Sequence, residues 1–319
     1  MIMKPRILVT KRIPEAGLKR LAEVFEVHLN EEERTLSHTE ILHLIPGFDA
    51  LLCLLTDRVD ADVIRAGKHL KCISNYAVGF NNIDLEAARS QSIIVCNTPG
   101  VLTETTADLA WALLMAAARL IPESDSFVRN NLFTGWEPML HLGMDIHGKR
   151  LGLIGMGRIG IAMAHRALGF NMQIQYYEQD DYSPPSGLKA TKTDLETLLK
   201  TSDFISIHTP LTPETKHLIG TEQFSMMKPT AVLVNTARGA ILDEKALVQA
   251  LLDRTIFAAG LDVYEYEPEL VSGLKDLPNA VLVAHIGSAS IETRTRMAML
   301  AAENAIAVIE GKEPPAGVI

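Results

Sequence analysis

Three ionisable side chains of complementary type follow apolar, β-rich runs in the last third of the chain. Arg238 lies in NTARG, Glu267 lies in YEYEP, and His285 directly follows the run AVLVA. Taken singly, each is more often structural than catalytic. In doubly wound sheets, however, ligands bind outside the carboxyl ends of the strands, and all three residues are expected at that edge. A guanidinium there can hold a carboxylate beside a carbonyl, and an imidazole can donate a proton.

A glycine-rich turn supplies the second chemical signal. Gly155, Gly157 and Gly160 form a GxGxxG pattern after the predicted strand Arg150–Ile154 and at the start of a helical pattern. In that context the first glycine permits a tight turn, the second admits a pyrophosphate, and the third allows close packing of helix and strand. Amides at the helix N-terminus then face phosphate oxygens. We expect a dinucleotide site here, with glycines of a plain strand–helix turn as the alternative.

The end of the next predicted strand indicates which dinucleotide is bound. Glu178 lies 178 − 160 = 18 residues after the last glycine, close to the roughly 20 expected for the carboxylate that binds the adenine ribose. Gln179, Asp180 and Asp181 follow, with no Arg or Lys before Lys189. A carboxylate repels a 2′-phosphate, so NADH is expected in preference to NADPH. The alternative is that Glu178 is only a polar strand end.

Strand and helix patterns alternate through most of the chain. Besides Arg150–Ile154, the predicted strands are Arg6–Thr10, Ala50–Leu55, Lys71–Ala77, Ile93–Asn97, Met172–Glu178, Phe204–Thr209, Ala231–Thr236, Phe257–Asp262 and Ala280–Ala284. This alternation predicts parallel sheets with helices on both faces. Two long helical patterns, Leu102–Asn130 and Ser290–Glu310, interrupt it. They indicate a discontinuous first domain, residues 1–100 plus 290–319, and a second domain, residues 101–289.

Composition narrows the class of protein. The chain has 319 residues, and 47% of them are hydrophobic, enough to form packed cores rather than a disordered chain. With 30 basic and 39 acidic residues the formal charge is −9, which argues against nucleic acid or an anionic membrane as a partner. The three cysteines have neither zinc-site nor disulfide spacing, so we expect buried thiols, no metal and a cytoplasmic location. Neither a signal peptide nor a membrane span is predicted.

Seven ordered motifs carry a family resemblance: NYAVGFNNID (75–84), NTPGVLTETTADLAWALL (97–114), GLIGMGRIG (152–160), HTPLTPET (208–215), LVNTARGAILDEKAL (233–247), AGLDVYEYEP (259–268) and AHIGSAS (284–290). Over essentially its whole length the sequence resembles the D-isomer-specific 2-hydroxyacid dehydrogenases, and among them the glyoxylate and hydroxypyruvate reductases. One departure is Ala284, where the family usually has proline before the histidine. The resemblance implies an α/β fold of two doubly wound parallel-sheet domains, a flavodoxin-like substrate domain and a Rossmann NAD domain, with a cleft between them.

The resemblance also implies roles for individual residues. Arg238, Glu267 and His285 would be catalytic: Arg238 polarises the substrate carbonyl, and His285, kept charged by Glu267, protonates the developing alkoxide. The substrate would be bound by Leu55, Val78, Gly79 and Arg238, with amides of Val78 and Gly79 facing its carboxylate. Residues implied around the cofactor are Thr106, Gly155, Gly157, Arg158, Ile159, Gly160, Glu178, Thr209, Pro210, Thr215, Thr236, Ala237, Asp262, His285 and Gly287.

Side branches of the family remain as alternatives, namely the phosphoglycerate, phosphite and D-lactate types. Formate dehydrogenases have Gln where Glu267 stands, phosphite dehydrogenases have Lys at Val78, and phosphoglycerate dehydrogenases often append a domain, whereas this chain ends soon after Gly311. A small apolar pocket formed by Leu55, Val78 and Trp136 favours glyoxylate or hydroxypyruvate. Two rivals from other classes are a non-catalytic NAD-binding scaffold and a hydrolase that holds NAD tightly.

Assembly is inferred from the segment that follows the first long helical pattern. The apolar helix from Leu102 and the loop around Trp136 resemble the dimer arm of the family, although such an apolar stripe could equally be core. We therefore expect a homodimer that acts on a small-molecule 2-keto or 2-hydroxy acid.

Overall fold

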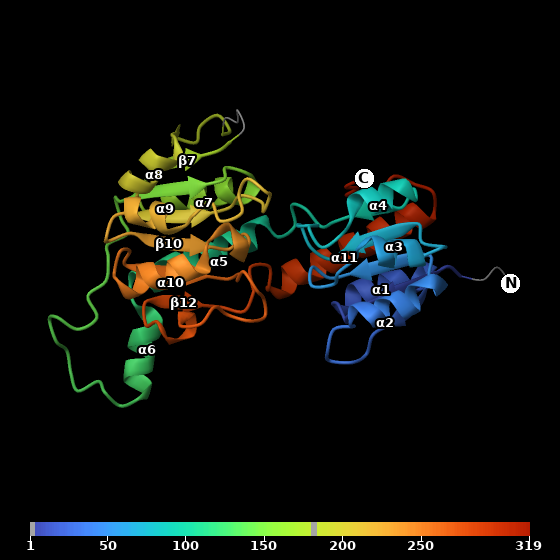
Figure 1. The fold of residues 1–319 in the computed structure, drawn as a ribbon, viewed down its shortest axis with the longest axis horizontal. Coiled ribbons are helices and arrows are strands. Elements are labelled where there is room, and N and C mark those ends of the chain that lie inside the picture. The colour runs from blue at the N-terminus through green and yellow to red at the C-terminus, as the bar shows by residue number, and fades with distance from the viewer. Residues whose placement is uncertain (1–3, 180–183) are drawn as a thin grey trace. The chain divides into compact units, whose positions relative to one another are not determined.

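The computed structural model describes residues 4–179 and 184–319, and its chain divides into two compact units. Unit 1 comprises the described part of Met1–Leu102 together with Ser288–Ile319, and unit 2 comprises Thr103–Gly287 apart from residues 180–183. Asp180 and Asp181, which entered the prediction of cofactor preference, lie outside the described residues. Figure 1 shows a parallel sheet covered by helices in each unit.

Unit 1 is built on a five-stranded parallel sheet with the order β2-β1-β3-β4-β5. The strands are β1 (Arg6–Val9), β2 (Glu26–Leu29), β3 (Ala50–Cys53), β4 (Cys72–Asn75) and β5 (Ile94–Cys96). The helices are α1 (Glu15–Val24), α2 (His38–Leu44), α3 (Ala61–Ala66), α4 (Leu85–Ser90) and α11 (Ile291–Ile309), with a 3-10 turn at Ile45–Gly47. This strand order is the flavodoxin-like one.

The last helix belongs to unit 1 although it follows unit 2 in the chain. Helix α11 packs on α1 and against β3, β4 and β5. A Cβ atom at Gly17 of α1 would lie 2.7 Å from the Cβ of Ala298, so the two helices meet at a distance that only glycine allows. The Ser74 hydroxyl donates to Ala301 O at 2.8 Å, which ties β4 to α11.

Unit 2 is built on a seven-stranded parallel sheet with the order β12-β11-β10-β9-β6-β7-β8. The strands are β6 (Arg150–Ile154), β7 (Gln173–Tyr177), β8 (Ala190–Lys192), β9 (Phe204–Ile207), β10 (Val232–Asn235), β11 (Ala258–Leu261) and β12 (Ala280–Leu282). The helices are α5 (Thr103–Ala118), α6 (Ile121–Arg129), α7 (Arg158–Leu168), α8 (Leu195–Thr201), α9 (Thr221–Met226) and α10 (Glu244–Leu252), with 3-10 turns at Gly239–Ile241 and Leu274–Asp276.

The strand order of unit 2 contains the Rossmann order, extended by one strand. If β6 is numbered 1 and the later strands are numbered in chain order, the sheet read from β8 to β12 has the order 3-2-1-4-5-6-7. The strand order therefore reverses between β6 and β9. Helices α5 and α7 pack together in the core on one face, and α8, α9 and α10 line the core on the other. The predicted fold class of two doubly wound parallel sheets is therefore confirmed.

Two features differ from the sequence-based expectations. The strands β2 and β8 were not predicted, because both are short and partly exposed edge strands without a buried apolar run. The helical pattern Leu102–Asn130 is divided into α5 and α6 at Leu120, which has the left-handed φ of 53°. Pro122 lies in the first turn of α6, where its missing N–H costs nothing, and so favours a new helix start.

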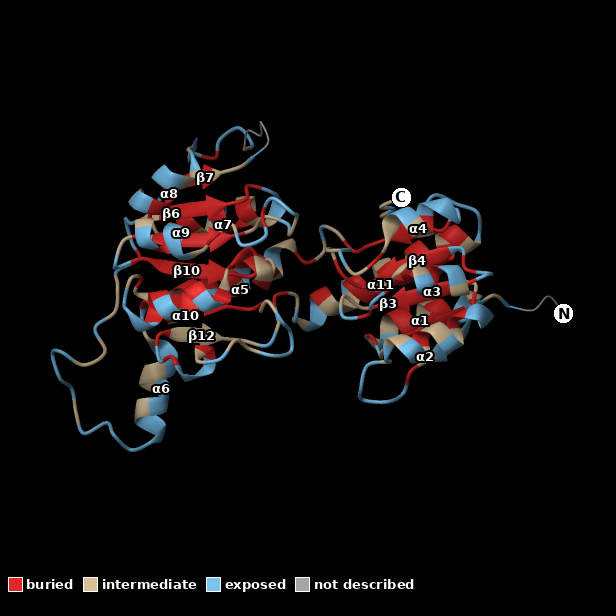
Figure 2. Cartoon of the chain, in the orientation of Figure 1, coloured by how far each residue is buried: buried red, intermediate tan, exposed pale blue. Residues whose placement is uncertain are grey.

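Burial follows the expected pattern (Figure 2). The central strands β3, β4, β9, β10 and β11 are buried along their whole length, as parallel strands covered on both faces must be. Cys53, Cys72 and Cys96 are buried free thiols, as predicted. No helix in the described part of the chain is long and apolar enough to cross a membrane.

Candidate active site

Three neighbouring strands of unit 2 position the predicted catalytic residues. β10, β11 and β12 are adjacent and parallel, so the segments that follow them leave the sheet at one edge. Arg238 follows β10, Glu267 follows β11 and His285 follows β12. The strand order thus explains how residues that are 47 positions apart in the sequence (285 − 238) reach a common edge.

The Arg238 turn packs directly against the segment that carries Glu267. A Cβ atom at Gly239 would lie 1.9 Å from the carbonyl carbon of Tyr264, so only glycine fits. Asn235 Nδ2 donates to Arg238 O at 2.9 Å, and Arg238 Nη1 donates to Ala237 O at 2.7 Å. Burial lowers the pKa of Arg238, and the negative charge of Glu267 opposes that shift. The turn therefore holds a half-buried guanidinium within the field of a carboxylate.

Glu267 and His285 form a hydrogen bond. His285 Nδ1 lies 2.9 Å from Glu267 Oε2, and Glu267 Oε1 accepts a bond from the Tyr264 N–H at 2.9 Å. Burial by itself would raise the pKa of Glu267. The bonds from His285 and Tyr264, with the charges of His285 and Arg238, hold the pKa below its usual value. An ionised Glu267 fixes the ring through Nδ1 and leaves Nε2 for proton exchange.

The His285 backbone is held in an uncommon conformation. Its φ is 52°, in the left-handed region that residues other than glycine rarely adopt. Asp262 accepts bonds from Ile286 N–H at 2.6 Å and Gly287 N–H at 2.8 Å, and so fixes the two peptides after His285. Burial raises the pKa of Asp262 above its usual value, although both amides oppose this. Asp262 was expected beside the cofactor, and sequence reasoning missed its bonds to this loop.

The glycine-rich turn lies at the point where the strand order of unit 2 reverses. Gly155 has φ of 95°, and a Cβ there would lie 2.6 Å from Thr209 N, so the turn after β6 lies against the end of β9. A Cβ at Gly160 would lie 2.3 Å from Gly155 O, so α7 begins very close to this turn. In contrast, a Cβ at Gly157 would meet no atom within 4 Å. The turn thus leaves open space at the glycine expected to face the pyrophosphate.

The surrounding residues fit a dinucleotide. Met156 N–H donates to Glu178 Oε2 at 2.9 Å, which places this carboxylate beside the glycine-rich turn. The Thr236 hydroxyl is buried at the end of β10 and has no hydrogen-bond partner within the described residues. A buried hydroxyl costs free energy unless it finds a partner, and a bound ligand can supply one. The site therefore has space for a pyrophosphate, a carboxylate suited to a ribose and an unsatisfied polar group.

The other residues expected at the cofactor are placed as follows. Arg158 and Ile159 begin α7, Thr106 lies in α5 close to Gly287, and Ala237 precedes Arg238. Thr209 and Pro210 follow β9. The Thr215 hydroxyl donates to Pro210 O at 2.7 Å and accepts from Thr212 N–H at 2.7 Å, so it stabilises the turn after β9.

The predicted substrate residues of unit 1 follow its central strands. Val78 and Gly79 lie in the loop after β4, and Leu55 lies two residues beyond β3. All three are at least partly accessible. Trp136, also expected at the substrate, belongs to unit 2, and its side chain is 85% exposed. The indole is therefore not enclosed in a pocket of this chain alone.

Other candidates prove structural. His208 is half-buried, its Nε2 lies 2.9 Å from the Ser206 hydroxyl, and burial lowers its pKa to about 3, so it is a neutral, hydrogen-bonded histidine. Within the described ranges, no group of three or more His, Cys, Asp or Glu side chains is arranged to hold a metal ion.

A turn suited to a dinucleotide and a hydrogen-bonded His–Glu pair at the carboxyl edge of the same sheet are features of an NAD(P)-dependent oxidoreductase. The family model described as "D-isomer specific 2-hydroxyacid dehydrogenase, NAD binding domain" matches residues 111–287, more than half of the chain. The chain belongs to the D-isomer specific 2-hydroxyacid dehydrogenase family.

Individual relatives agree with this assignment. A glyoxylate reductase of Korarchaeum cryptofilum is 50% identical over 98% of this chain and 95% of its own length. A crystal structure of a protein from Thermus thermophilus has 47% identity and a TM-score of 0.93, covering 98% of this chain and 100% of that protein. An NADPH-dependent glyoxylate/hydroxypyruvate reductase of Sinorhizobium meliloti, solved with NADP and malonate, has 32% identity and a TM-score of 0.87, covering 99% and 97% of the two chains.

Two glycine substitutions separate cofactor binding from folding. Gly157→Ala places its Cβ in open space at a φ of −71°, so the melting temperature should stay within about 1 °C of the wild type. The Kd for NADH should rise about tenfold or more, because the methyl group occupies the pyrophosphate position. Gly160→Ala, whose Cβ would meet Gly155 O, should lower the melting temperature. Thermal unfolding and NADH fluorescence titration measure both; equal effects of the two variants would contradict these roles.

Proposed function

We propose that the protein reduces a short 2-keto acid, glyoxylate or hydroxypyruvate, to the D-2-hydroxy acid with NADH as the preferred cofactor. The observation that carries this proposal is the 2.9 Å bond between His285 Nδ1 and Glu267 Oε2 beside the Arg238 turn. The relatives called glyoxylate reductases support the substrate class. When bound, the reduced nicotinamide supplies the hydride that the carbonyl carbon accepts.

The residues of the chain then supply binding and the proton. Arg238 binds the substrate carboxylate and its carbonyl oxygen, and charge-assisted bonds polarise that carbonyl. Nε2 of the imidazolium form of His285 donates a proton to the alkoxide oxygen as the new C–H bond forms. In unit 1, the amides of Val78 and Gly79 serve the carboxylate and Leu55 limits substrate size. Unit 1 is accordingly proposed as the substrate domain and unit 2 as the NAD domain.

Glu267 sets the pH range of this chemistry. Its pKa lies below the usual value, so it stays ionised in neutral solution and the bond to His285 is lost only as the pH falls through the lowered pKa. The ionised Glu267 carboxylate keeps its hydrogen bond with His285 Nδ1. Reduction requires the protonated form of His285 and oxidation of the hydroxy acid requires the neutral one, so the reductive rate falls as the pH rises.

Replacing His285 tests the proposal directly. His285→Gln should lower kcat for NADH-dependent glyoxylate reduction by about 100-fold or more, because a glutamine side chain donates no proton to the alkoxide. The remaining rate should lack the fall with rising pH that the wild type shows. NADH binding should persist. The measurement is NADH consumption from pH 5 to pH 10, together with NADH titration of both proteins.

A matched control is a second His–Glu pair, whose glutamate lies on the loop that carries Glu267. His217 Nε2 is 2.7 Å from Glu265 Oε1, two residues before Glu267, so His217→Gln also breaks a His–Glu pair. It should reduce glyoxylate at nearly the wild-type rate. Full activity of His285→Gln would refute the acid assignment. A wild-type protein that binds NADH but reduces no 2-keto acid would instead support a non-catalytic scaffold.

Cofactor preference rests on Glu178. Its carboxylate is fixed by Met156 N–H, and a 2′-phosphate on the adenine ribose would face this negative charge. Glu178→Gln keeps an oxygen for Met156 and removes the charge, so the ratio of kcat/KM for NADPH to that for NADH should rise about tenfold. Glu196→Gln, at an exposed position of α8, is the control and should leave the ratio unchanged. An unchanged ratio in Glu178→Gln would contradict the assignment.

A homodimer is proposed from the arm, defined here as residues 121–145. α6 and the loop after it leave the core of unit 2 (Figure 1), and their side chains are mostly exposed or half-buried (Figure 2). Their exposed apolar side chains are Ile121, Val128, Leu132, Phe133, Trp136, Met139 and Leu142, each more than half exposed. Such clustering in one segment is typical of a protein interface. A second copy of the chain is the occupant that the family resemblance implies.

Polar substitutions on the arm test this assembly. Trp136→Ser with Met139→Ser should convert a dimer into a monomer at micromolar concentration, as measured by sedimentation velocity, because two exposed apolar side chains of the interface are lost. Leu252→Ser removes an apolar side chain of similar exposure (58%) from α10 and should leave the dimer intact. Sedimentation of the wild type as a monomer would contradict the proposal.

The buried, free state of all three cysteines supports a reducing compartment, and we place the protein in the cytoplasm.

A further inference from the structure

Two consecutive peptide N–H groups in the loop after β11 bind two different carboxyl groups. Tyr264 N–H donates to Glu267 Oε1 at 2.9 Å, and Glu265 N–H donates to Glu244 Oε1 at 2.7 Å. Glu267 is the carboxyl that binds His285, whereas Glu244 is the first residue of α10. The backbone that carries Glu267 is therefore attached to the start of α10 through a single side chain.

Glu244 is not the residue that caps α10. The cap is Asp243, whose side chain accepts bonds from Lys245 N–H at 3.0 Å and Ala246 N–H at 3.1 Å. Glu244 is 1% exposed, and its Oε2 atom is buried without a hydrogen-bond partner in the part of the chain that the structure describes. Burying a carboxyl group that lacks one of its partners costs folding free energy. The stability of the helix therefore does not explain a carboxyl group at this position.

The peptide that Glu244 holds also lies against the Arg238 turn. A Cβ atom at Gly239 would lie 1.9 Å from the carbonyl carbon of Tyr264 and 2.3 Å from Glu265 N. A peptide group is planar, so a bond to its N–H fixes the direction of its carbonyl as well. Glu244 follows Arg238 by only six residues (244 − 238). One hydrogen bond thus joins the segment that carries Arg238 to the segment that carries Glu267.

We infer that Glu244 is a positioning residue, which keeps Glu267 within hydrogen-bond distance of His285 by holding the N–H of Glu265. The inference rests on the proposed function and adds to it a residue that touches neither the substrate nor the cofactor. Glu244 acts through the backbone of the loop after β11, and Glu267 and His285 remain the groups that act in the reaction.

The protonation of Glu267 reports whether the loop is in place. Burial by itself would raise the pKa of Glu267, and the bonds from His285 and from Tyr264 N–H contribute to holding that pKa below its usual value. If the loop moves, Glu267 loses these donors and its pKa rises, so protonation breaks the bond to His285 at a higher pH. The fall of kcat on the acid side should therefore move to a higher pH.

Other ionisable groups also act on Glu267, and a test has to separate their charges from the position of the loop. The groups that interact electrostatically with Glu267 are His285, Arg238, Asp262, Glu244 and Tyr264. Glu265, two residues earlier, is paired with His217. Removal of the Glu244 carboxyl group takes away a repulsive neighbour as well as the bond, so one variant must change the group and keep the bond.

Three substitutions of Glu244 make this separation. Glu244→Gln keeps an oxygen for Glu265 N–H and removes the ionisable group, so kcat for glyoxylate reduction with NADH should stay within about threefold of the wild type. Glu244→Asp keeps the carboxyl group, but the side chain is one methylene shorter and its oxygen no longer reaches Glu265 N–H. Glu244→Ala removes the bond altogether. Glu244→Asp and Glu244→Ala should lower kcat about tenfold and move its acid-side fall to a higher pH, with the KM for NADH changed less than about twofold.

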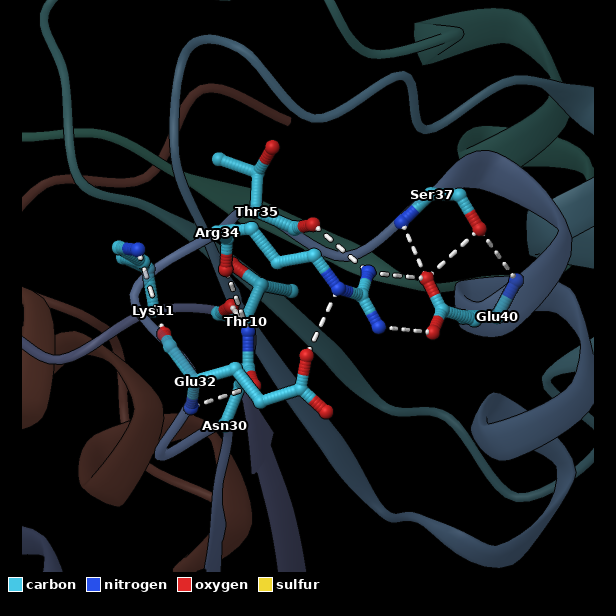
Figure 3. Close-up of polar contacts among 8 residues, drawn as sticks. All are labelled: Thr10, Lys11, Asn30, Glu32, Arg34, Thr35, Ser37 and Glu40. Carbon is cyan, nitrogen blue, oxygen red and sulfur yellow. Dashed lines mark hydrogen bonds and ion pairs between the residues drawn. The ribbon is translucent and has the colours of Figure 1, made fainter.

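Unit 1 contains a matched control. Glu40, in the first turn of α2, accepts a bond from Ser37 N–H at 2.8 Å, as Figure 3 shows. Glu40→Ala therefore also removes a bond between a carboxyl group and a backbone N–H at the start of a helix, but in the unit that carries neither Glu267 nor His285. It should lower the melting temperature and leave kcat and its pH profile as in the wild type.

An NMR titration tests the inference without substrate. With isotope-labelled glutamate carboxyl groups, the signal of Glu267 is identified by its absence in Glu267→Gln. This signal should titrate at a higher pH in Glu244→Asp and Glu244→Ala than in the wild type, because Glu267 has lost its donors. In Glu244→Gln and Glu40→Ala it should titrate no higher than in the wild type.

A lower kcat with a displaced acid-side fall in Glu244→Asp and Glu244→Ala, and recovery of both in Glu244→Gln, supports the inference. Wild-type kinetics in the first two variants, or an equal loss in all three, overturns it. If Glu244→Ala does not fold, Glu244→Asp gives the decision alone. If the wild type reduces no glyoxylate, the proposed function fails and the titration still decides: a displaced Glu267 signal in Glu244→Asp supports the inference, and an unchanged one overturns it.

Discussion

The bond between His285 Nδ1 and Glu267 Oε2 is the constraint on which the arrangement of unit 2 depends. It has a useful geometry only if two loops from neighbouring strands keep a fixed separation. Tyr264 links them, since its N–H binds Glu267 Oε1 and its hydroxyl donates to Val283 O at 2.8 Å. The missing side chain of Gly239 lets the Arg238 turn approach the same segment. Three strand ends are thereby joined around the hydrogen bond between His285 and Glu267.

This arrangement brings several buried carboxylates together. Burying a carboxylate costs folding free energy unless it accepts hydrogen bonds. Asp262 and Glu244 are each 1% exposed, and burial raises the pKa of both. Their donors are backbone amides: Ile286 and Gly287 for Asp262, and Glu265 N–H at 2.7 Å for Glu244. Glu267 is the exception, since its pKa is lowered by its cationic neighbours. The site thus has two carboxylates that stabilise loops and one that keeps its charge for His285.

The alternation of strand and helix patterns predicted the two parallel sheets, whereas the roles of the site residues stay predictions. Gly155 and Gly160 show the close approaches expected of their motif, and Glu267 and His285 are bonded. The short edge strands β2 and β8 were missed because partly exposed strands lack an apolar run. The asparagine bonds to the loop after β4 were equally invisible. Asn75 and Asn97 are 22 residues apart (97 − 75), and their partners are backbone carbonyls, which no side-chain pattern reports.

In both units a buried side chain fixes the backbone of a loop at the edge of the sheet, but one unit uses a hydrogen-bond acceptor and the other uses donors. In unit 2, Asp262 is an acceptor, so it binds peptide N–H groups and fixes the loop that presents the His285 ring. In unit 1, Asn75 and Asn97 are donors, so they bind the carbonyls of Gly79 and Val78 in the loop after β4. In both units, a buried side chain at a strand end therefore supplies the hydrogen-bond partner that the backbone of a neighbouring loop needs.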